Sequence, residues 1–251
     1  MSYPIALIFG LSPSIIWLLF FLRKDVHPES NKMVLKIFFL GALITLPAVL
    51  IELGIEKGLN KWASPLASAI YIFLGIAFVE EFLKYLVVRE KVLSNPEFDE
   101  PVDVLLYMII AALGFAALEN ILVLLPKEKP LFFYETAIIS FLRFIGATFL
   151  HALCSGTMGY FLALSFFEIK KKLRLTILGL VIATVLHGLF NLFIMEIDKT
   201  LLVYNGEITI VNFPLFIFLL LSLIAILIGL AIFVLFSFKK VKKLTSTCKI
   251  K

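Results

Sequence analysis

The feature that most limits how this chain can fold is a series of apolar stretches, each about as long as a membrane is thick. The stretches run over residues 3–22, 33–55, 65–88, 103–125, 135–167, 175–197 and 213–238. A helix needs about 20 apolar residues to cross the hydrocarbon core of a bilayer. We therefore predict an all-α fold, a polytopic transmembrane helix bundle of about seven spans.

Composition supports a cell-membrane protein, since 61% of the residues are hydrophobic and the mean hydropathy is +1.06. Soluble domains have about 45–50% apolar residues. We expect a single integral membrane domain over residues 1–251. The first stretch lacks a basic start and precedes a basic loop, so we interpret it as a retained helix. The fifth is too long for one crossing, and Arg143 and Gly146 indicate a short lead-in helix.

Lysine and arginine predict the direction of the spans, because cytoplasmic loops are enriched in both. Loops and tail on one side hold sixteen of them, against five on the other. This places the N-terminus outside and the C-terminus inside. The positive charge is explained by anionic lipid at the inner surface and is not evidence for nucleic acid. We predict no disulfide between Cys154 and Cys248, and a small external hairpin around residues 205–206.

Some polar side chains interrupt the apolar stretches. Placing such a side chain at the centre of a membrane helix costs on the order of 2–3 kcal/mol of free energy. These residues therefore usually face the bundle interior and have a function. We expect Glu80, Glu81, Glu119, His151, His187 and Asn191 to converge on one cavity between the third and sixth spans. The functional core is then at 65–197, and the spans at 3–22, 33–55 and 213–238 pack peripherally. The candidate site residues are Glu80, Glu81, Lys84, Glu119, Asn120, His151, His187 and Asn191.

The third span carries Glu80, Glu81 and Lys84 at helical spacing, so both carboxylates can reach the ammonium group. Two adjacent buried carboxylates repel, which separates their proton affinities as acid–base chemistry requires. The alternative is a charge cluster at the helix end. In the fourth span, small residues at 114–117 allow another helix to approach before Glu119 and Asn120. For Asn120, a hydrogen bond between helices is an equal alternative.

Each of the next two spans carries one histidine. His151 shares a face with Ser155, and His187 shares a face with Asn191. Both histidines also have a purely structural interpretation. Serine catalysis is disfavoured, because a helical serine hydroxyl normally bonds its own backbone and no nucleophile elbow is present. Cys154 is interpreted as a packing residue.

A metal site is the main alternative to metal-free chemistry, since two His and one Glu form a known catalytic zinc set. The sequence lacks His-Glu-x-x-His, but ligands from separate spans remain open. We predict a metal-independent hydrolase with no cofactor. The reasons are that the glutamates and histidines lie at different distances from their span ends, and that Lys84 disfavours a second cation.

Four motifs in order resemble the PrsW family of intramembrane proteases, a relative of the CAAX prenyl proteases and bacteriocin-processing proteins. They are Glu80-Glu81-x-x-Lys84, Phe115-x-x-x-Glu119-Asn120, His151 and His187-x-x-x-Asn191. The family often has Asp at the position of Asn191 and Gly at that of Val104.

The resemblance implies a glutamic-type peptidase that cuts a membrane-anchored protein, in the best-studied case an anti-sigma factor. It implies water activation by Glu80 or Glu81, assistance by His151, and oxyanion stabilisation by His187 and Asn191. A proton-coupled transporter is the alternative from another class, because buried carboxylates and histidines also relay protons. Transporters usually show repeated halves, and we find none.

Overall fold

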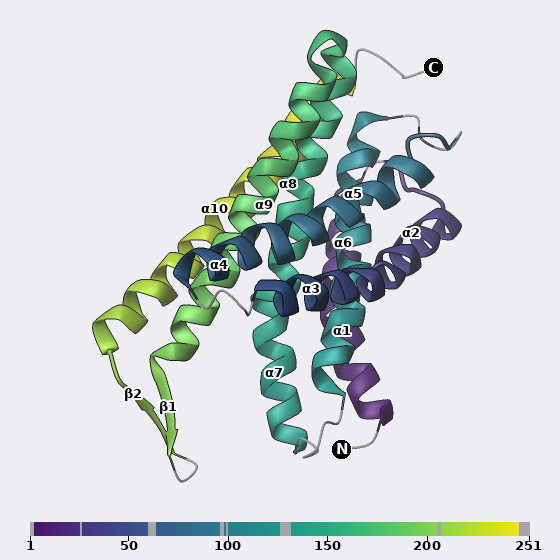
Figure 1. The fold of residues 1–251 in the computed structure, drawn as a ribbon. Coiled ribbons are helices and arrows are strands. Elements are labelled where there is room, and N and C mark those ends of the chain that lie inside the picture. Colours follow the sequence, from purple (N-terminus) through teal and green to yellow (C-terminus); the bar gives the residue numbers. More distant parts are fainter. Residues whose placement is uncertain are drawn as a thin grey trace.

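The computed structural model describes residues 3–25, 27–59, 64–95, 98, 100–125, 132–204 and 207–245. Helices make up nearly all of this part of the chain (Figure 1). One two-stranded hairpin precedes the last helix in the sequence. The elements are α1 (Tyr3–Leu22), α2 (Asn31–Leu43), α3 (Thr45–Leu59), α4 (Pro65–Ile70), η2 (Tyr71–Phe78), α5 (Val79–Lys91), α6 (Pro101–Leu124), α7 (Phe133–Ile145), α8 (Ala147–Phe167), η3 (Ile169–Lys171), α9 (Lys172–Lys199), β1 (Leu201–Tyr204), β2 (Glu207–Ile210) and α10 (Phe213–Thr245).

Seven helical segments within the described residues are long and apolar enough to cross a membrane, which confirms the predicted class of fold. Two of the seven are broken. The second divides into α2 and α3 at Ile44. Pro47, in the first turn of α3, has no backbone N–H to donate a hydrogen bond to the preceding helical turn. The fifth divides at Gly146 into α7 and α8, so the predicted lead-in helix is present.

The third span contains a stretch of π-helix that the sequence did not indicate. η2 covers eight residues and leads directly into α5, which has ordinary α-helical geometry. A π-helix holds more residues per turn than an α-helix and is often found at functional sites. The stretch therefore changes the phase of the helix just before Glu80, and so decides which face of α5 Glu80 and the residues after it present.

α6 lies at the centre of the bundle, and almost all of its side chains are buried. It packs against α8, α2 and α1. Glycines allow α2 to approach closely, because a Cβ on Gly114 would lie 1.9 Å from the Phe38 carbonyl oxygen. On the other side of the same contact, a Cβ on Gly41 would lie 2.1 Å from the Ala111 oxygen. The small residues before Glu119 thus admit a neighbouring helix, as predicted.

The loops expected inside the cell meet at one end of the bundle. Lys242 of α10 donates a hydrogen bond to the Lys24 carbonyl after α1. His27, in the same loop, lies 2.9 Å from Glu100 at the start of α6. In Figure 1 this end is at the top, and the hairpin and the N-terminal end of α1 lie at the bottom. The arrangement is compatible with the predicted orientation, which itself stays a prediction.

The predicted hairpin is present, and its external location stays a prediction. β1 and β2 pair antiparallel, with Leu201 opposite Ile210 and Tyr204 opposite Glu207. Cys154 is buried and free. Several residues used in the predictions lie outside the described part of the chain: Lys61, Asp99, Lys127, Lys129, Asn205, Gly206, Cys248, Lys249 and Lys251.

Candidate active site

Four helices bring the charged and imidazole side chains of the sequence motifs together in the bundle interior. α5 contributes Glu80, Glu81 and Lys84, which are all buried. α6 contributes Glu119, and α8 and α9 contribute one histidine each. The predicted convergence on a single site is confirmed for Glu80, Glu81, Glu119, His151 and His187, and Lys84 lies among them.

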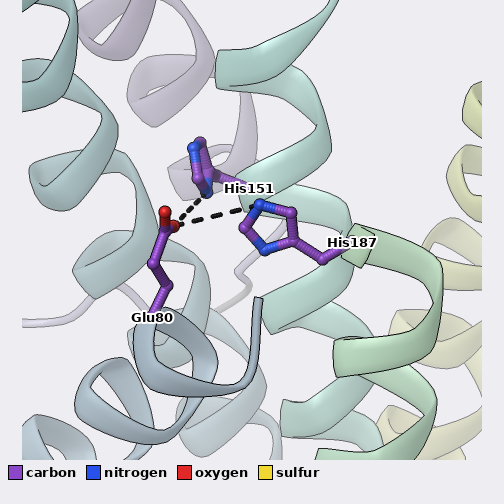
Figure 2. Close-up of side chains that lie close together, drawn as sticks. All are labelled: Glu80, His151 and His187. Carbon is purple, nitrogen blue, oxygen red and sulfur yellow. Dashed lines mark ion pairs between the residues drawn. The ribbon is translucent and has the colours of Figure 1, made fainter. Parts of the chain in front are cut away.

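Glu80 faces both histidines (Figure 2). Its Oε2 lies 3.6 Å from Nδ1 of His151 and 3.9 Å from Nε2 of His187. The two imidazole rings meet edge to face, with their centroids 5.0 Å apart. Glu80, His151 and His187 each offer one ligand atom, and these atoms all lie within 4.8 Å of one another. The three side chains thus surround one point.

The other nitrogen of each imidazole is held by a carboxylate. Nε2 of His151 lies 2.9 Å from Glu119 Oε2, and Nδ1 of His187 lies 3.0 Å from Glu81 Oε1. A carboxylate only accepts hydrogen bonds, so each of these outer nitrogens donates its proton. The inner nitrogens, Nδ1 of His151 and Nε2 of His187, therefore carry lone pairs directed at the point shared with Glu80.

Lys84 links the two glutamates of α5 to one histidine. Its Nζ lies 2.8 Å from Glu81 Oε1, 3.2 Å from Glu80 Oε2 and 2.9 Å from His151 Nδ1. The ring of Phe115 lies beneath the ammonium group, with 4.4 Å between Nζ and the ring centroid. All three ammonium protons have acceptors, so the lysine is fixed in one position and neutralises part of the carboxylate charge.

Arg143 is a site residue that sequence reasoning missed. Its Nη2 lies 3.0 Å from Glu119 Oε2, and its Nε donates to Asn120 Oδ1. The sequence showed Arg143 only as an interruption of the fifth span. A usable signal was available, because an arginine inside an apolar stretch needs a buried acceptor, and the unassigned carboxylate of Glu119 was a candidate partner.

Asn120 belongs to the helix packing around the site and has no contact with its centre. Its Nδ2 donates to the Gly10 carbonyl of α1 at 3.3 Å and to Thr148 Oγ1 at 3.0 Å. The hydrogen bond between helices, one of the two interpretations, is therefore present. It also connects the first span to the residue next to Glu119.

Ser155 corrects an expectation. Its hydroxyl does not bond to its own backbone but donates to Glu81 Oε2 at 2.7 Å. The reason is proximity, since the buried carboxylate of α5 accepts a stronger hydrogen bond than a carbonyl already used in the helix. Asn191 is half-buried one turn after His187, and its amide makes no hydrogen bond to any described residue.

One premise behind the predicted metal independence is wrong. We expected the glutamates and histidines at different depths, yet the ligand atoms of Glu80, His151 and His187 all lie within 4.8 Å of one another. The span containing α4, η2 and α5 crosses the direction of α6 in Figure 1, so distance from a span end does not measure depth. Metal dependence itself stays untested.

Comparison with known proteins identifies the family. The profile described as PrsW family intramembrane metalloprotease matches residues 29–230. Protease PrsW of Geobacillus kaustophilus is 35% identical over 192 residues, covering 76% of this chain and 80% of that protein. Protease PrsW of Bacillus subtilis is 32% identical over 192 residues, covering 76% and 83%. That of Clostridioides difficile is 25% identical over 190 residues, covering 74% and 77%.

No solved structure matches the chain. The family profile covers more than half of the sequence, and it includes every residue of the buried site. The seven apolar helices agree with an enzyme that works inside the membrane. This chain therefore belongs to the PrsW family of intramembrane proteases.

Proposed function

We propose that this chain hydrolyses a peptide bond of a membrane-anchored protein at Glu80, His151 and His187, which hold a divalent metal ion. The observation that carries the proposal is the orientation of the two imidazoles. Each has a carboxylate on its outer nitrogen and turns its inner nitrogen towards Glu80 Oε2. Carboxylates placed in this way on metal-bound histidines are a common feature of metal sites in proteins.

The spacing of the donor atoms fits such an ion. Ligands bonded to zinc at about 2.0–2.2 Å in a tetrahedron lie about 3.4 Å from one another. The distances from Glu80 Oε2 to the two inner nitrogens, 3.6 and 3.9 Å, are close to that spacing. Glu and His are also the ligand types found in catalytic zinc sites with one open position.

The balance of charged side chains in the site also supports a bound cation. Three carboxylates, those of Glu80, Glu81 and Glu119, are paired with only two cationic side chains, Lys84 and Arg143. A net negative charge in a water-poor interior is unfavourable unless a cation balances it. A divalent ion at the shared point provides that balance.

A bound divalent metal lowers the proton affinity of water and polarises the scissile carbonyl. Glu119 and Glu81 keep the imidazoles in the tautomers that leave the inner nitrogens without a proton. Lys84 holds the α5 carboxylates in place. Asn191 lies on the same face of α9 as His187, and we assign its free amide as a donor to the oxyanion of the intermediate.

Metal-free hydrolysis is the second candidate, and one contact favours it. The ammonium of Lys84 lies 2.9 Å from His151 Nδ1, so a cation already occupies part of the space. In that case Glu80 activates water directly, and His151 orients it. The two candidates share the same residues and differ in their dependence on an ion.

The substrate class follows from the location of the site. The reacting groups are buried between spans, so a substrate reaches them from within or beside the bilayer. We therefore assign a membrane-anchored protein as substrate. Single-span anti-sigma factors, which the family resemblance implies, are the first class to test.

The test is co-expression with single-span candidates, followed by mass spectrometry of membrane fragments. Glu80→Gln is expected to abolish cleavage, since loss of a ligand or base costs at least ~10²–10⁴-fold. Glu90→Gln, which alters an exposed carboxylate on the same helix, is the matched control and is expected to be fully active.

Purified enzyme is then assayed after chelation, together with elemental analysis. Lost activity that returns with stoichiometric zinc supports the metal-dependent form. Full activity after chelation supports the metal-free form. Unchanged cleavage by Glu80→Gln contradicts both.

A further inference from the structure

We propose that Glu52 of α3 is a further catalytic residue, which takes a proton from the attacking water and passes it to the leaving amine. This inference deepens the proposed function and rests on it. Glu52 belongs to none of the sequence motifs and lies on a span that was expected to be peripheral.

α3 is anchored beside the site. Thr45 Oγ1, at its first residue, donates to the Phe115 carbonyl of α6 at 3.2 Å. The ring of Phe115 contacts both Lys84, at 4.4 Å, and His151, at 5.6 Å between centroids. Thr45 and Glu52 are seven residues apart and so lie on the same face of α3. Glu52 is therefore on the side of α3 that faces the bundle.

The carboxylate of Glu52 has an oxygen without a partner. Its Oε1 is buried and makes no hydrogen bond to any described residue. The nearby charges that act on this carboxyl group include Glu80, Glu119 and Lys84, all of them site residues. A buried polar atom without a partner costs about 1–3 kcal/mol, so it needs an explanation. Water and substrate are the partners that a hydrolase provides.

The two carboxylates that hold the histidines are less suited to move a proton. Both oxygens of Glu81 accept hydrogen bonds, from Lys84 and His187 on one side and from Ser155 on the other. Oε2 of Glu119 is shared by His151 and Arg143. A carboxylate that already accepts several strong hydrogen bonds binds a proton poorly. Glu52 keeps the free acceptor that a general base requires.

A cavity lined in part by polar side chains lies beside α3, towards the end of the bundle near the hairpin. One turn further along α3, Glu56 lines a cavity of about 230 Å³ between α3, α4 and α9. Ser64, Ser68 and Tyr71 also line this cavity. Their hydroxyl groups can bind water, so water can collect one helical turn away from Glu52.

The proton balance needs no further reactant. Glu52 removes one proton from water while the water oxygen forms a bond to the scissile carbonyl carbon. The protonated carboxyl group then donates that proton to the amide nitrogen as the carbon–nitrogen bond breaks. The products are a carboxylic acid and an amine, and Glu52 returns to its starting state. This use of one group as base and then acid is standard in general acid–base catalysis.

The experiment compares purified Glu52→Gln with wild type and with Lys57→Gln, which changes an exposed charge on the same helix. Glu52→Gln is expected to lower kcat by ~10²–10⁴-fold with little change in KM. Its melting temperature in detergent is expected to stay equal or rise, because the change removes a buried charge without a partner. Metal content is expected to stay equal to wild type, and Glu52→Asp to recover part of kcat.

Unchanged kcat in Glu52→Gln overturns the inference, and so does a loss of activity explained fully by lower stability or metal content. If Glu52→Gln is active while Glu80→Gln is inactive, only the role of Glu52 fails. If both variants cleave normally, the proposed function itself fails. Lys57→Gln is expected to match wild type throughout.

Discussion

Each histidine of the site is held by a carboxylate, but the two carboxylates lie in different surroundings. His187 depends on Glu81, whose side chain is fully buried and also binds Lys84 and Ser155. His151 depends on Glu119, whose side chain is 28% exposed and is paired with Arg143 at 17% exposure. One support lies deep between α5, α8 and α9, and the other lies near the junction of α7 and α8.

The two carboxylate–imidazole contacts therefore need not contribute equally to stability and activity. Water cannot replace a lost partner in a fully buried cluster, so each remaining charge there is left without compensation. At the partly exposed support, water and side-chain movement can restore some of the lost interaction. We therefore expect the His187 support to be the more sensitive of the two.

Glu81→Gln is expected to have the largest effect of the support variants. Breaking a buried ion pair by removing one charge costs about 3–5 kcal/mol, and Lys84 would lose its shortest contact. We expect cleavage to be lost and the melting temperature in detergent to fall, measured by a fragment assay and thermal unfolding. A Glu81→Gln enzyme that is as stable and active as wild type would contradict the inequality between the supports.

Arg143→Gln tests the second support and is expected to have an intermediate effect. Arg143 holds Glu119, the outer partner of His151, and in metal sites the loss of such support typically costs ~10–100-fold in metal affinity or activity. We expect kcat to fall by that amount, and Arg143→Lys to recover part of it because the positive charge beside Glu119 returns. The pH dependence of kcat should also shift in Arg143→Gln, since His151 then has a less firmly held partner. If Arg143→Gln is more damaging than Glu81→Gln, the comparison is reversed.

Ser155→Ala is expected to have the smallest effect of the three. Its hydroxyl supplies one of the hydrogen bonds to Glu81, and a hydrogen bond to a charged group contributes about 1.5–3 kcal/mol. The remaining contacts of Glu81 retain part of that, so we expect about a tenfold fall in kcat. Cys154→Ala, one residue earlier on α8, is the control and should be close to wild type. Complete loss of activity in Ser155→Ala with normal folding would instead indicate a nucleophilic serine.

Much of the fold and part of the site could be predicted from local sequence patterns. The lengths of the apolar stretches predicted the seven spans, and Gly146 predicted the break between α7 and α8. Five polar residues of the motifs converge as expected, because a polar group inside a membrane span is stabilised only where other polar groups surround it in the bundle interior. The four-residue spacing of Glu80 and Lys84 correctly predicted their contact, since helical geometry alone brings them together.

Only the tertiary structure decided which atoms meet. The sequence placed Asn120 and Ser155 on helices but did not reveal that one bonds to α1 and the other to Glu81. The sequence analysis also did not identify Glu119 as the partner of Arg143, because the two residues lie on different helices. The physical reason is that helix crossing and the π-helix before Glu80 set relative depth and rotation, and these depend on how whole helices pack rather than on any one segment.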